Sequence, residues 1–372
     1  MVGLGEALRL EFSGPDRFVA AQAAWRDLAD RARITDDVRI PGSGLVAFGA
    51  FAFADDSAAT SVLIVPRVVV GRRGDRAWVT HIDGDDRTTP PSPAPRRRGD
   101  EYRLTFSPGA MTHAAYTEAV DRALARIATG EVEKVVLARD IEARLPRFAD
   151  LRLAIGELTA GYPDCWNFAV DGFLGASPET LVRVAAGTVG ARVLAGSAPR
   201  GADKEADAAI AAALVASDKD RAEHGFAVQS VLDALAPHTA ELTANPTPFP
   251  LKLPNLWHLA SDVTGRLPEG ATSLDLLSAL HPTAAVAGTP REAALAVIRE
   301  LEPFDRGRYA GPVGWVGASG DGEWAVGLRS AQLAADGTLT AYAGAGIVAG
   351  SDADRELNET RLKLRPIVEA FG

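Results

Sequence analysis

Cysteine and long hydrophobic runs are nearly absent from this sequence. Its 372 residues include one Cys and two Met, and aromatic residues make up 6%. A single cysteine, Cys165, cannot form an internal disulfide, which fits a reducing cytoplasm. No apolar run approaches the roughly 20 residues of a membrane-spanning helix, and no basic segment before an apolar stretch marks a secretory signal. We therefore expect a cytoplasmic protein that does not cross a membrane.

Basic residues are also fewer than acidic ones. Lys and Arg number 39 against 49 Asp and Glu, which gives a net charge of −10. Because such a chain repels phosphate backbones, general binding to nucleic acid is disfavoured. A hydrophobic fraction of 47% with 24% charged residues is that of an ordinary globular protein, and it excludes a disordered, collagen-like or coiled-coil chain. An acidic protein that acts on anionic substrates would need local cations or a metal.

Short β-type runs separated by turn residues dominate the first hundred residues. The segment 87–100 is rich in Pro and Arg and predicts an exposed loop. It is short and lacks aromatic residues, so a nucleic-acid patch is not favoured there. We expect strands at 44–48, 61–65, 67–70 and 77–82.

From Met111 onward, helices and strands alternate. Apolar residues spaced three and four apart over 116–127 predict an amphipathic helix with Gly130 at its C-cap. The later elements show no regular βαβ order, which favours an α+β fold over a doubly wound one. Further strands are expected at 134–139, 167–170, 180–184, 190–194, 255–266, 311–319, 323–333 and 338–343, and helices at 202–214, 217–235, 272–280 and 290–301.

The last helix is expected to begin at Ser351. Ser351 and Asp354 resemble a capping box in which Asp replaces the usual Glu, and Pro366 should kink or end the helix. The glycine-rich stretch just before it, 344–350, resembles a dinucleotide-binding loop. The sequence after Gly350 offers one helix and no second strand, so a nicotinamide site is not favoured. A glycine turn whose backbone amides bind a carboxylate is the better interpretation.

Two predicted helices carry carboxylates three residues apart. Asp220 and Glu223 share one face of the helix at 217–235, and Glu356 and Glu359 share one face of the last helix. Carboxylate oxygens are the ligands that Mg²⁺ prefers, so the two pairs could converge on this ion. Charged pairs at this spacing are common on solvated helix faces, and on spacing alone that simpler interpretation is favoured.

Three other residues stand in apolar or turn surroundings. Lys134 lies in a strand of Val, Leu and Ala, where a lysine either extends to solvent or belongs to a site. Glu179 stands at a turn that enters a strand. Each of them, taken alone, is better explained as structural, and so is Cys165, whose neighbours match no nucleophile motif.

Together these segments resemble the chorismate-utilising enzyme family of the anthranilate synthase component I type. The resemblance covers roughly 110–370, and the motifs occur in the family's order, so the set is far more specific than any one of them. The matching stretches are Glu-Lys-Val-Val-Leu-Ala-Arg at 133–139, Ser-Pro-Glu-Thr-Leu-Val at 177–182, Leu-Ala-Gly-Ser-Ala-Pro-Arg-Gly at 194–201, Ser-Asp-Lys-Asp-Arg-Ala-Glu-His at 217–224, and Gly-Ala-Gly-Ile-Val at 344–348 followed by 356–363.

The resemblance implies a reaction for two of these residues. Lys134 would deprotonate a water, and Glu179 would protonate the hydroxyl that leaves chorismate. It also implies a Mg²⁺ ion, held by Glu223 and Glu359, with Asp220 and Glu356 supporting it through waters. The substrate-binding positions implied are Gly196, Ser197, His258, Ala285, Tyr309, Arg329, Gly344, Gly346 and Lys363.

Three positions distinguish members of the family. Water-using members carry Lys where Lys134 stands, whereas ammonia-using anthranilate synthases typically have Gln. Aminodeoxychorismate synthases typically carry a nucleophilic Lys where this chain has Ala195, and salicylate synthases tend to have Thr at Ala285. The resemblance is therefore closest to isochorismate synthases, which are isomerases. It implies no glutamine amidotransferase partner, and a product used for menaquinone or catechol siderophores.

The fold implied is one large α+β unit over 1–372, with two stacked antiparallel-rich β-sheets and outer helices. The strands of 1–105 would complete the sandwich, 110–370 would hold the catalytic motifs, and the chain would be a monomer. Three other functions stay open at this point: a salicylate synthase that also eliminates pyruvate, a catalytically inactive relative that acts as a binding protein, and a nicotinamide oxidoreductase.

Overall fold

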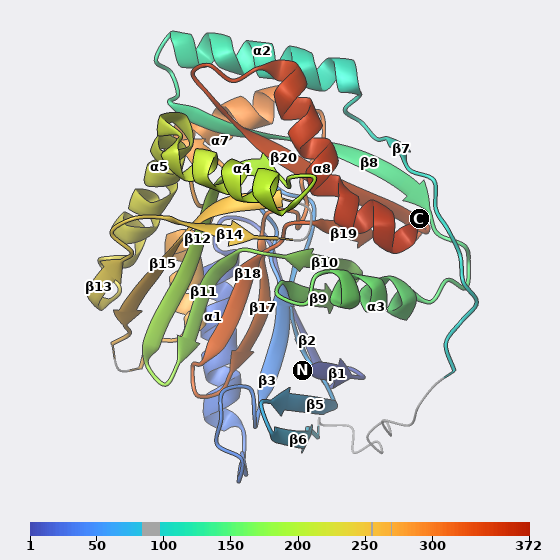
Figure 1. The fold of residues 1–372 in the computed structure, drawn as a ribbon. Helices are drawn as coiled ribbons and strands as arrows, with labels where there is room; N and C mark the ends of the chain where they lie inside the picture. The colour runs from blue at the N-terminus through green and yellow to red at the C-terminus, as the bar shows by residue number, and fades with distance from the viewer. Residues whose placement is uncertain (84–96, 254–255, 269) are drawn as a thin grey trace.

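Two large β-sheets form the framework of the chain, and every strand pair among the described residues is antiparallel. The computed structural model describes residues 1–83, 97–253, 256–268 and 270–372. Strands and helices are interleaved along the chain without parallel crossovers, so the fold is α+β, as predicted. Figure 1 shows the strands of the larger sheet roughly upright, with a long strand of the second sheet crossing the upper part of the molecule.

The larger sheet has ten strands and joins strands from the N-terminal region to strands from the later part of the sequence. Its N-terminal strand Val46–Ala50 (β3) pairs with Pro312–Gly317 (β17), which places Phe48 opposite Trp315. The spatial order is β13-β15-β12-β11-β18-β17-β3-β4-β2, with β14 pairing to β15. The other bounds are β2 Leu8–Phe12, β4 Ser61–Val65, β11 Thr180–Ala185, β12 Thr188–Pro199, β13 Ala240–Ala244, β14 Phe249–Lys252, β15 Leu256–Arg266 and β18 Gly322–Val326.

The second sheet has seven strands, in the order β16-β8-β20-β19-β10-β9, with β7 pairing to β8. Its two longest strands, Lys134–Arg144 (β8) and Thr338–Val348 (β20), pair along their whole length. A separate small sheet joins β1, β5 and β6. The remaining bounds are β7 Ser107–Pro108, β9 Trp166–Val170, β10 Phe173–Ser177, β16 Gly288–Thr289, β19 Ser330–Leu333, β1 Val2–Leu4, β5 Val68–Arg73 and β6 Arg76–His81.

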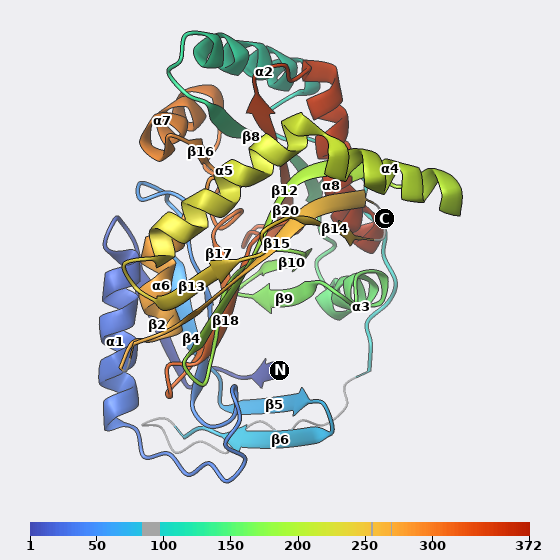
Figure 2. The same ribbon diagram turned by 60° about the vertical axis from the view of Figure 1, so that its left-hand side comes forward.

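Helices cover the sheets and supply two walls of the site described below. Helices α1, α5 and α6 pack against the ten-stranded sheet, and α2, α3, α7 and α8 pack against the seven-stranded one (Figure 2). No helix among the described residues is both long and apolar enough to cross a membrane. The bounds are α1 Arg17–Arg31, α2 His113–Ala128, α3 Leu151–Gly161, α4 Lys204–Ala216, α5 Asp218–Leu235, α6 Ser273–Leu280, α7 Arg291–Leu301 and α8 Ala353–Phe371.

Sequence patterns and structure agree best where an amphipathic period meets clear end signals. Helix α2 buries Tyr116, Ala119, Val120 and Ala123; its N-cap is a threonine, and Gly130 follows with φ of 77°. The first hundred residues are rich in strands, as expected, but they also contain α1, which was not expected and which buries Phe18, Ala21 and Trp25 at helical spacing. Helix α3 was not expected either. Of the predicted loop 87–100, residues 87–96 lie outside the described residues, and 97–100 are exposed and belong to no helix or strand.

Three boundaries near the C-terminus differ from the sequence prediction. The expected strand 323–333 is two strands in different sheets, because the chain turns at Arg329, whose φ is 50°. The expected glycine turn at 344–350 is wrong for its first part, since Gly344 and Gly346 lie inside β20 opposite Ala138 and Val136.

The last helix also begins and ends differently. Asp352, not Ser351, caps α8 by accepting a hydrogen bond from the Arg355 amide, while the Ser351 hydroxyl is bonded to the Val348 amide. The helix does not end at Pro366 but continues to Phe371. The buried face of α8, which includes Leu364, Pro366 and Ile367, packs on the seven-stranded sheet, and this packing offsets the cost of an internal proline.

Candidate active site

One cavity between the sheets collects residues from many distant parts of the chain. Strands β12, β15 and β20, helices α5 and α8, and the segments around 179, 285, 306–310 and 329 all contribute to its wall. It is lined by Glu179, Gly196, Ser197, Asp220, Glu223, His258, Ala285, Tyr309, Arg329, Gly344, Gly346, Glu356, Glu359 and Lys363, together with Val136, Pro178, Leu194, Ala195, Lys219, Val286, Arg306, Ala310, Leu328 and Arg355. The structure therefore brings together every site residue predicted from the sequence except Lys134.

Lys134 lies directly behind this wall. Its side chain is 1% exposed, and its Nζ is 3.2 Å from Oε1 of Glu223, which does line the cavity. Burial opposes ionisation of Glu223, but Lys134, together with Lys363 and Lys219, outweighs it and lowers the pKa of this carboxyl. Gly346 on β20 leaves the room for this pair, since a Cβ there would lie 2.7 Å from Oε1 of Glu223.

Glu179 is the buried acid of the cavity. It stands at the turn between β10 and β11, where its amide donates to the Ser177 hydroxyl at 3.2 Å. Burial raises its pKa to about 7, although the nearby Lys134 and Arg329 act in the opposite direction. A carboxyl with this pKa is partly protonated at neutral pH, so it can give a proton to a leaving group.

A hydrogen-bonded row of three side chains lies across the cavity. Arg329 donates through Nη2 to Nε2 of His258 at 3.2 Å, and Nδ1 of His258 lies 2.9 Å from the Ser197 hydroxyl. Burial and the Arg329 charge lower the pKa of His258 well below its usual value, so the ring is neutral. Since Arg329 occupies Nε2 as a donor, Nδ1 carries the proton, and its acceptors are the Ser197 hydroxyl and, at 3.3 Å, the Gly196 carbonyl. The Ser197 hydroxyl hydrogen is then available to a bound molecule.

Three of the cavity carboxylates are paired with lysines. Besides Lys134 and Glu223, Nζ of Lys363 lies 2.6 Å from Oε1 of Glu359 and donates to the Gly344 carbonyl at 3.0 Å. Lys219 lies 3.7 Å from Glu356, whose pKa is raised by burial and by the neighbouring Glu359. This group of four carboxylates, Asp220, Glu223, Glu356 and Glu359, gives the site strong negative charge that nearby cations offset.

The donor chemistry of this group fits Mg²⁺, because all of its ligands would be carboxylate oxygens. Among the described residues, however, no three acidic, His or Cys side chains lie close enough to hold a metal ion. The lysine pairing accounts for this separation, since Lys134 and Lys363 each hold one of the carboxylates predicted as direct ligands. Each lysine contacts Oε1 of its partner, so a metal bound here would share these two carboxylates with the lysines or displace them.

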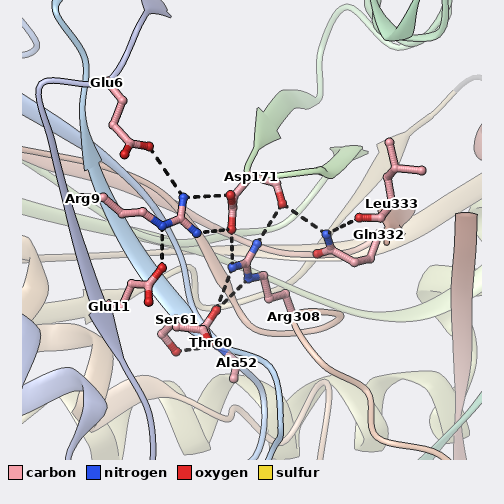
Figure 3. Close-up of polar contacts among 10 residues, drawn as sticks. All are labelled: Glu6, Arg9, Glu11, Ala52, Thr60, Ser61, Asp171, Arg308, Gln332 and Leu333. Atoms are coloured by element: carbon pink, nitrogen blue, oxygen red, sulfur yellow. Dashed lines mark hydrogen bonds and ion pairs between the residues drawn. The ribbon is translucent and has the colours of Figure 1, made fainter. Parts of the chain in front are cut away.

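The loop that carries Tyr309 is fixed from outside the cavity. Arg308 donates through Nη2 to Asp171 Oδ2 at 2.7 Å and to the Thr60 carbonyl at 2.7 Å, and Arg9 of β2 donates to both Asp171 oxygens. Figure 3 shows Asp171 between the two guanidinium groups. These contacts join the N-terminal strands to the β9–β10 hairpin and to the loop that carries Tyr309, whose ring stacks on Tyr342 at 5.3 Å.

Sequence reasoning missed three charged residues of the cavity wall: Lys219, Arg306 and Arg355. Lys219 stands inside the quoted motif at 217–224, so it could have been included with Asp220 and Glu223. Arg306 follows Glu302 by four residues, a spacing at which opposite charges can meet, and this was the available signal for it.

Comparison with known proteins agrees with this geometry. A family model described as chorismate binding enzyme matches residues 1–372. The isochorismate synthase DhbC of Bacillus subtilis is 40% identical over 269 residues, covering 69% of this chain and 67% of that protein. The salicylate biosynthesis isochorismate synthase of Pseudomonas aeruginosa is 34% identical over 403 aligned positions, covering 99% and 82%.

Solved structures show the same architecture. MenF, the menaquinone-specific isochorismate synthase from Escherichia coli, superposes with a TM-score of 0.76 at 28% identity, covering 98% of this chain and 85% of that one. A fold of two large antiparallel sheets around an acid-rich cavity is that of a chorismate-handling enzyme. The chain belongs to the chorismate binding enzyme family.

Proposed function

We propose that this chain is an isochorismate synthase, an isomerase that converts chorismate to isochorismate. The observation that carries the proposal is the buried Glu179, whose pKa of about 7 suits a general acid and which shares one cavity with Arg329 and four carboxylates. Relatives from Bacillus subtilis and Pseudomonas aeruginosa that are named isochorismate synthases support it.

The reaction adds water to C2 of the chorismate ring and releases the hydroxyl at C4, while the ring double bonds shift. One C–O bond forms and one breaks, and one water is consumed for each water released, so the product is an isomer of the substrate. In our proposal Lys134 takes a proton from the attacking water, and Glu179 gives a proton to the departing hydroxyl. Ala195, which lines the cavity, leaves room for water where a nucleophilic lysine would bond to the ring.

Cationic and hydroxyl groups of the cavity would hold the two substrate carboxylates. We assign the enolpyruvyl carboxylate to Arg329 and Tyr309, because a guanidinium forms charge-assisted bonds to carboxylates. The Ser197 hydroxyl, whose oxygen is occupied by His258, is left as a donor toward the substrate. The ring carboxylate would bind on the side of Glu223 and Glu359.

We also propose that the enzyme uses Mg²⁺, held by Glu223 and Glu359 and supported through waters by Asp220 and Glu356. When bound, the ion supplies positive charge for the ring carboxylate in a protein whose net charge is −10. The proposal extends to a cytoplasmic monomer that uses water rather than ammonia and has no glutamine amidotransferase subunit. Its product would enter menaquinone or catechol siderophore biosynthesis.

Product analysis tests this function directly. Purified protein is incubated with chorismate and Mg²⁺, and the products are separated by liquid chromatography and identified by NMR. We expect isochorismate without an equivalent amount of pyruvate, in keeping with Ala285 in the cavity wall. Salicylate with stoichiometric pyruvate would replace the proposal by salicylate synthase, and untouched chorismate would contradict both.

A further inference from the structure

A buried ion pair outside the predicted site closes the back of the cavity. Glu302 follows α7, and Arg306 stands four residues later in the loop that leads to Tyr309. Both side chains are 2% exposed, and they share two hydrogen bonds, Nη2 to Oε1 at 2.6 Å and Nε to Oε2 at 2.8 Å. Such a pair is costly to bury, so its presence calls for a specific role.

The pair completes the hydrogen bonding of β8. On one side β8 pairs with β20, and on the other β16 pairs only with Lys134 and Val135. Directly after that short pairing, Arg306 donates to the Val136 carbonyl at 2.7 Å, and Glu302 accepts from the Ala138 amide at 2.7 Å. The two side chains therefore take the place of a neighbouring strand at the point where the strand bearing Lys134 would otherwise lack a partner.

The same guanidinium holds two further walls of the cavity. Its Nη1 donates to the Val286 carbonyl at 2.9 Å, next to Ala285, and the group lies over the Phe53 ring at 4.5 Å. It also lies 6.0 Å from the ring of Tyr309. One buried ion pair thus links the strand of the base, the segment around Ala285 and the substrate-binding loop.

We infer that Glu302 and Arg306 are positioning residues, which fix Lys134 and the Ala285 segment relative to the substrate. The inference rests on the proposed function for its catalytic part. An apolar pair of similar volume could fill this space at similar or better stability, but it could not bond to the carbonyls of Val136 and Val286 or to the Ala138 amide. In this inference the role of the ion pair is to align three backbone segments through its bonds to their carbonyl and amide groups.

The test uses Arg306→Lys, which keeps the charge and removes the planar fork of donors. Amide hydrogen exchange should become at least tenfold faster in 134–138 and 285–287, and not in β12. With chorismate, kcat should fall tenfold or more while KM changes less than threefold. If Arg306→Lys does not fold, Glu302→Gln combined with Arg306→Met replaces it, because no buried charge is then left unpaired.

Arg17→Met is the matched control. Arg17 is also 2% exposed, and it also bonds to backbone carbonyls, those of Ala52 and Phe53, but it does not line the cavity. We expect this variant to lose thermal stability and to keep kcat within twofold. Unchanged exchange in 134–138, or a folded Arg306→Lys protein with kcat within twofold of the wild type, would overturn the inference. Amide hydrogen exchange tests whether the ion pair holds these segments, and it needs no chorismate. A wild-type protein without turnover would therefore contradict only the proposed function.

Discussion

Nζ of Lys134 lies 3.2 Å from Oε1 of Glu223, so the residue proposed as base is covered by a residue proposed as metal ligand. The lysine side chain is almost wholly buried, and the carboxylate stands between it and the cavity. In our proposal the Glu223 carboxylate shifts to let water reach the Lys134 nitrogen. The two proposed roles are therefore coupled, because a cation bound through Glu223 would compete with Lys134 for the same carboxylate.

Gly346→Ala tests this coupling with one added methyl group. Its Cβ would lie 2.7 Å from Oε1 of Glu223 and 3.1 Å from Cε of Lys134, both near the ends of flexible side chains. These side chains can shift at little cost, so we expect a melting temperature close to that of the wild type and a kcat at least tenfold lower. Gly190→Ala, whose Cβ would meet nothing within 4 Å, is the control and should change neither. Full activity of Gly346→Ala would show that the Lys134–Glu223 geometry does not matter.

Removing either proposed proton-transfer group should abolish most turnover. We expect Lys134→Ala and Glu179→Gln to fold and to lose about a hundred- to ten-thousand-fold in kcat, which is the usual contribution of a positioned acid or base. Steady-state assays of chorismate consumption, together with circular dichroism of each variant, measure this. Near-normal turnover by either variant would remove the role assigned to that residue.

The raised pKa of Glu179 predicts that the stability of the wild type depends on pH in a way that the Glu179→Gln variant does not. The folded-state pKa is about 7 against 4.5 for the free side chain, so the folded protein binds the extra proton and loses stability as pH rises from about 4.5 to 7. Glu179→Gln removes this loss and should melt higher than the wild type at pH 8, with little difference at pH 4.5. In the wild type, kcat/KM should fall as pH rises above 7, because the acid is then ionised. A melting difference that does not vary with pH would contradict the buried-acid assignment.

Removing divalent metal should stop the reaction if the carboxylate group holds Mg²⁺. Chelator-treated protein should be inactive and recover on addition of Mg²⁺. Thermal-shift titration with Mg²⁺ gives a second readout, in which Glu223→Gln and Glu359→Gln should need at least tenfold more ion for half the effect. Glu292→Gln on α7, whose side chain is 85% exposed, should titrate like the wild type. Full activity after chelation would end the metal proposal.

Asp171 predicts a stability effect confined to higher pH. Hydrogen bonding to Arg9 and Arg308, opposed by partial burial, lowers its pKa to about 2. A depressed folded-state pKa stabilises the protein above pH 3.8, and this contribution is lost as pH falls toward 2. Asp171→Asn should therefore melt lower than the wild type at pH 7, and the difference should shrink as pH falls below 4. Equal melting at pH 7 would show that the contacts in Figure 3 add nothing to stability.

Local elements of the fold were predictable because their signals lie close together in the sequence. Helix α2 has a complete apolar face and end signals, and the apolar run beginning at Lys134 is the start of β8. The pairing of strands that lie far apart in the sequence has no such local signal. Nothing near Val46–Ala50 indicates that this strand joins Pro312–Gly317, because register depends on packing between distant segments.

The family resemblance predicted which residues form the site, but it did not predict how their side chains contact one another. The resemblance indicated Glu179, Arg329 and the carboxylates of α5 and α8, and the structure places them around one cavity. The pairing of Lys134 with Glu223 and of Lys363 with Glu359 depends on side-chain directions in the folded protein. The role of Arg306 was hidden for the same reason, since its partners are backbone groups far away in sequence.

The pairing of β3 with β17 has a consequence for how the protein is made. The N-terminal strands leave the ribosome first, but the strand that covers the edge of β3 is synthesised near the other end of the chain. During translation β3 therefore presents an unpaired, largely apolar edge to other nascent chains. Yield in cells should then depend on chaperone capacity and on the speed of elongation more than on the stability of the finished enzyme.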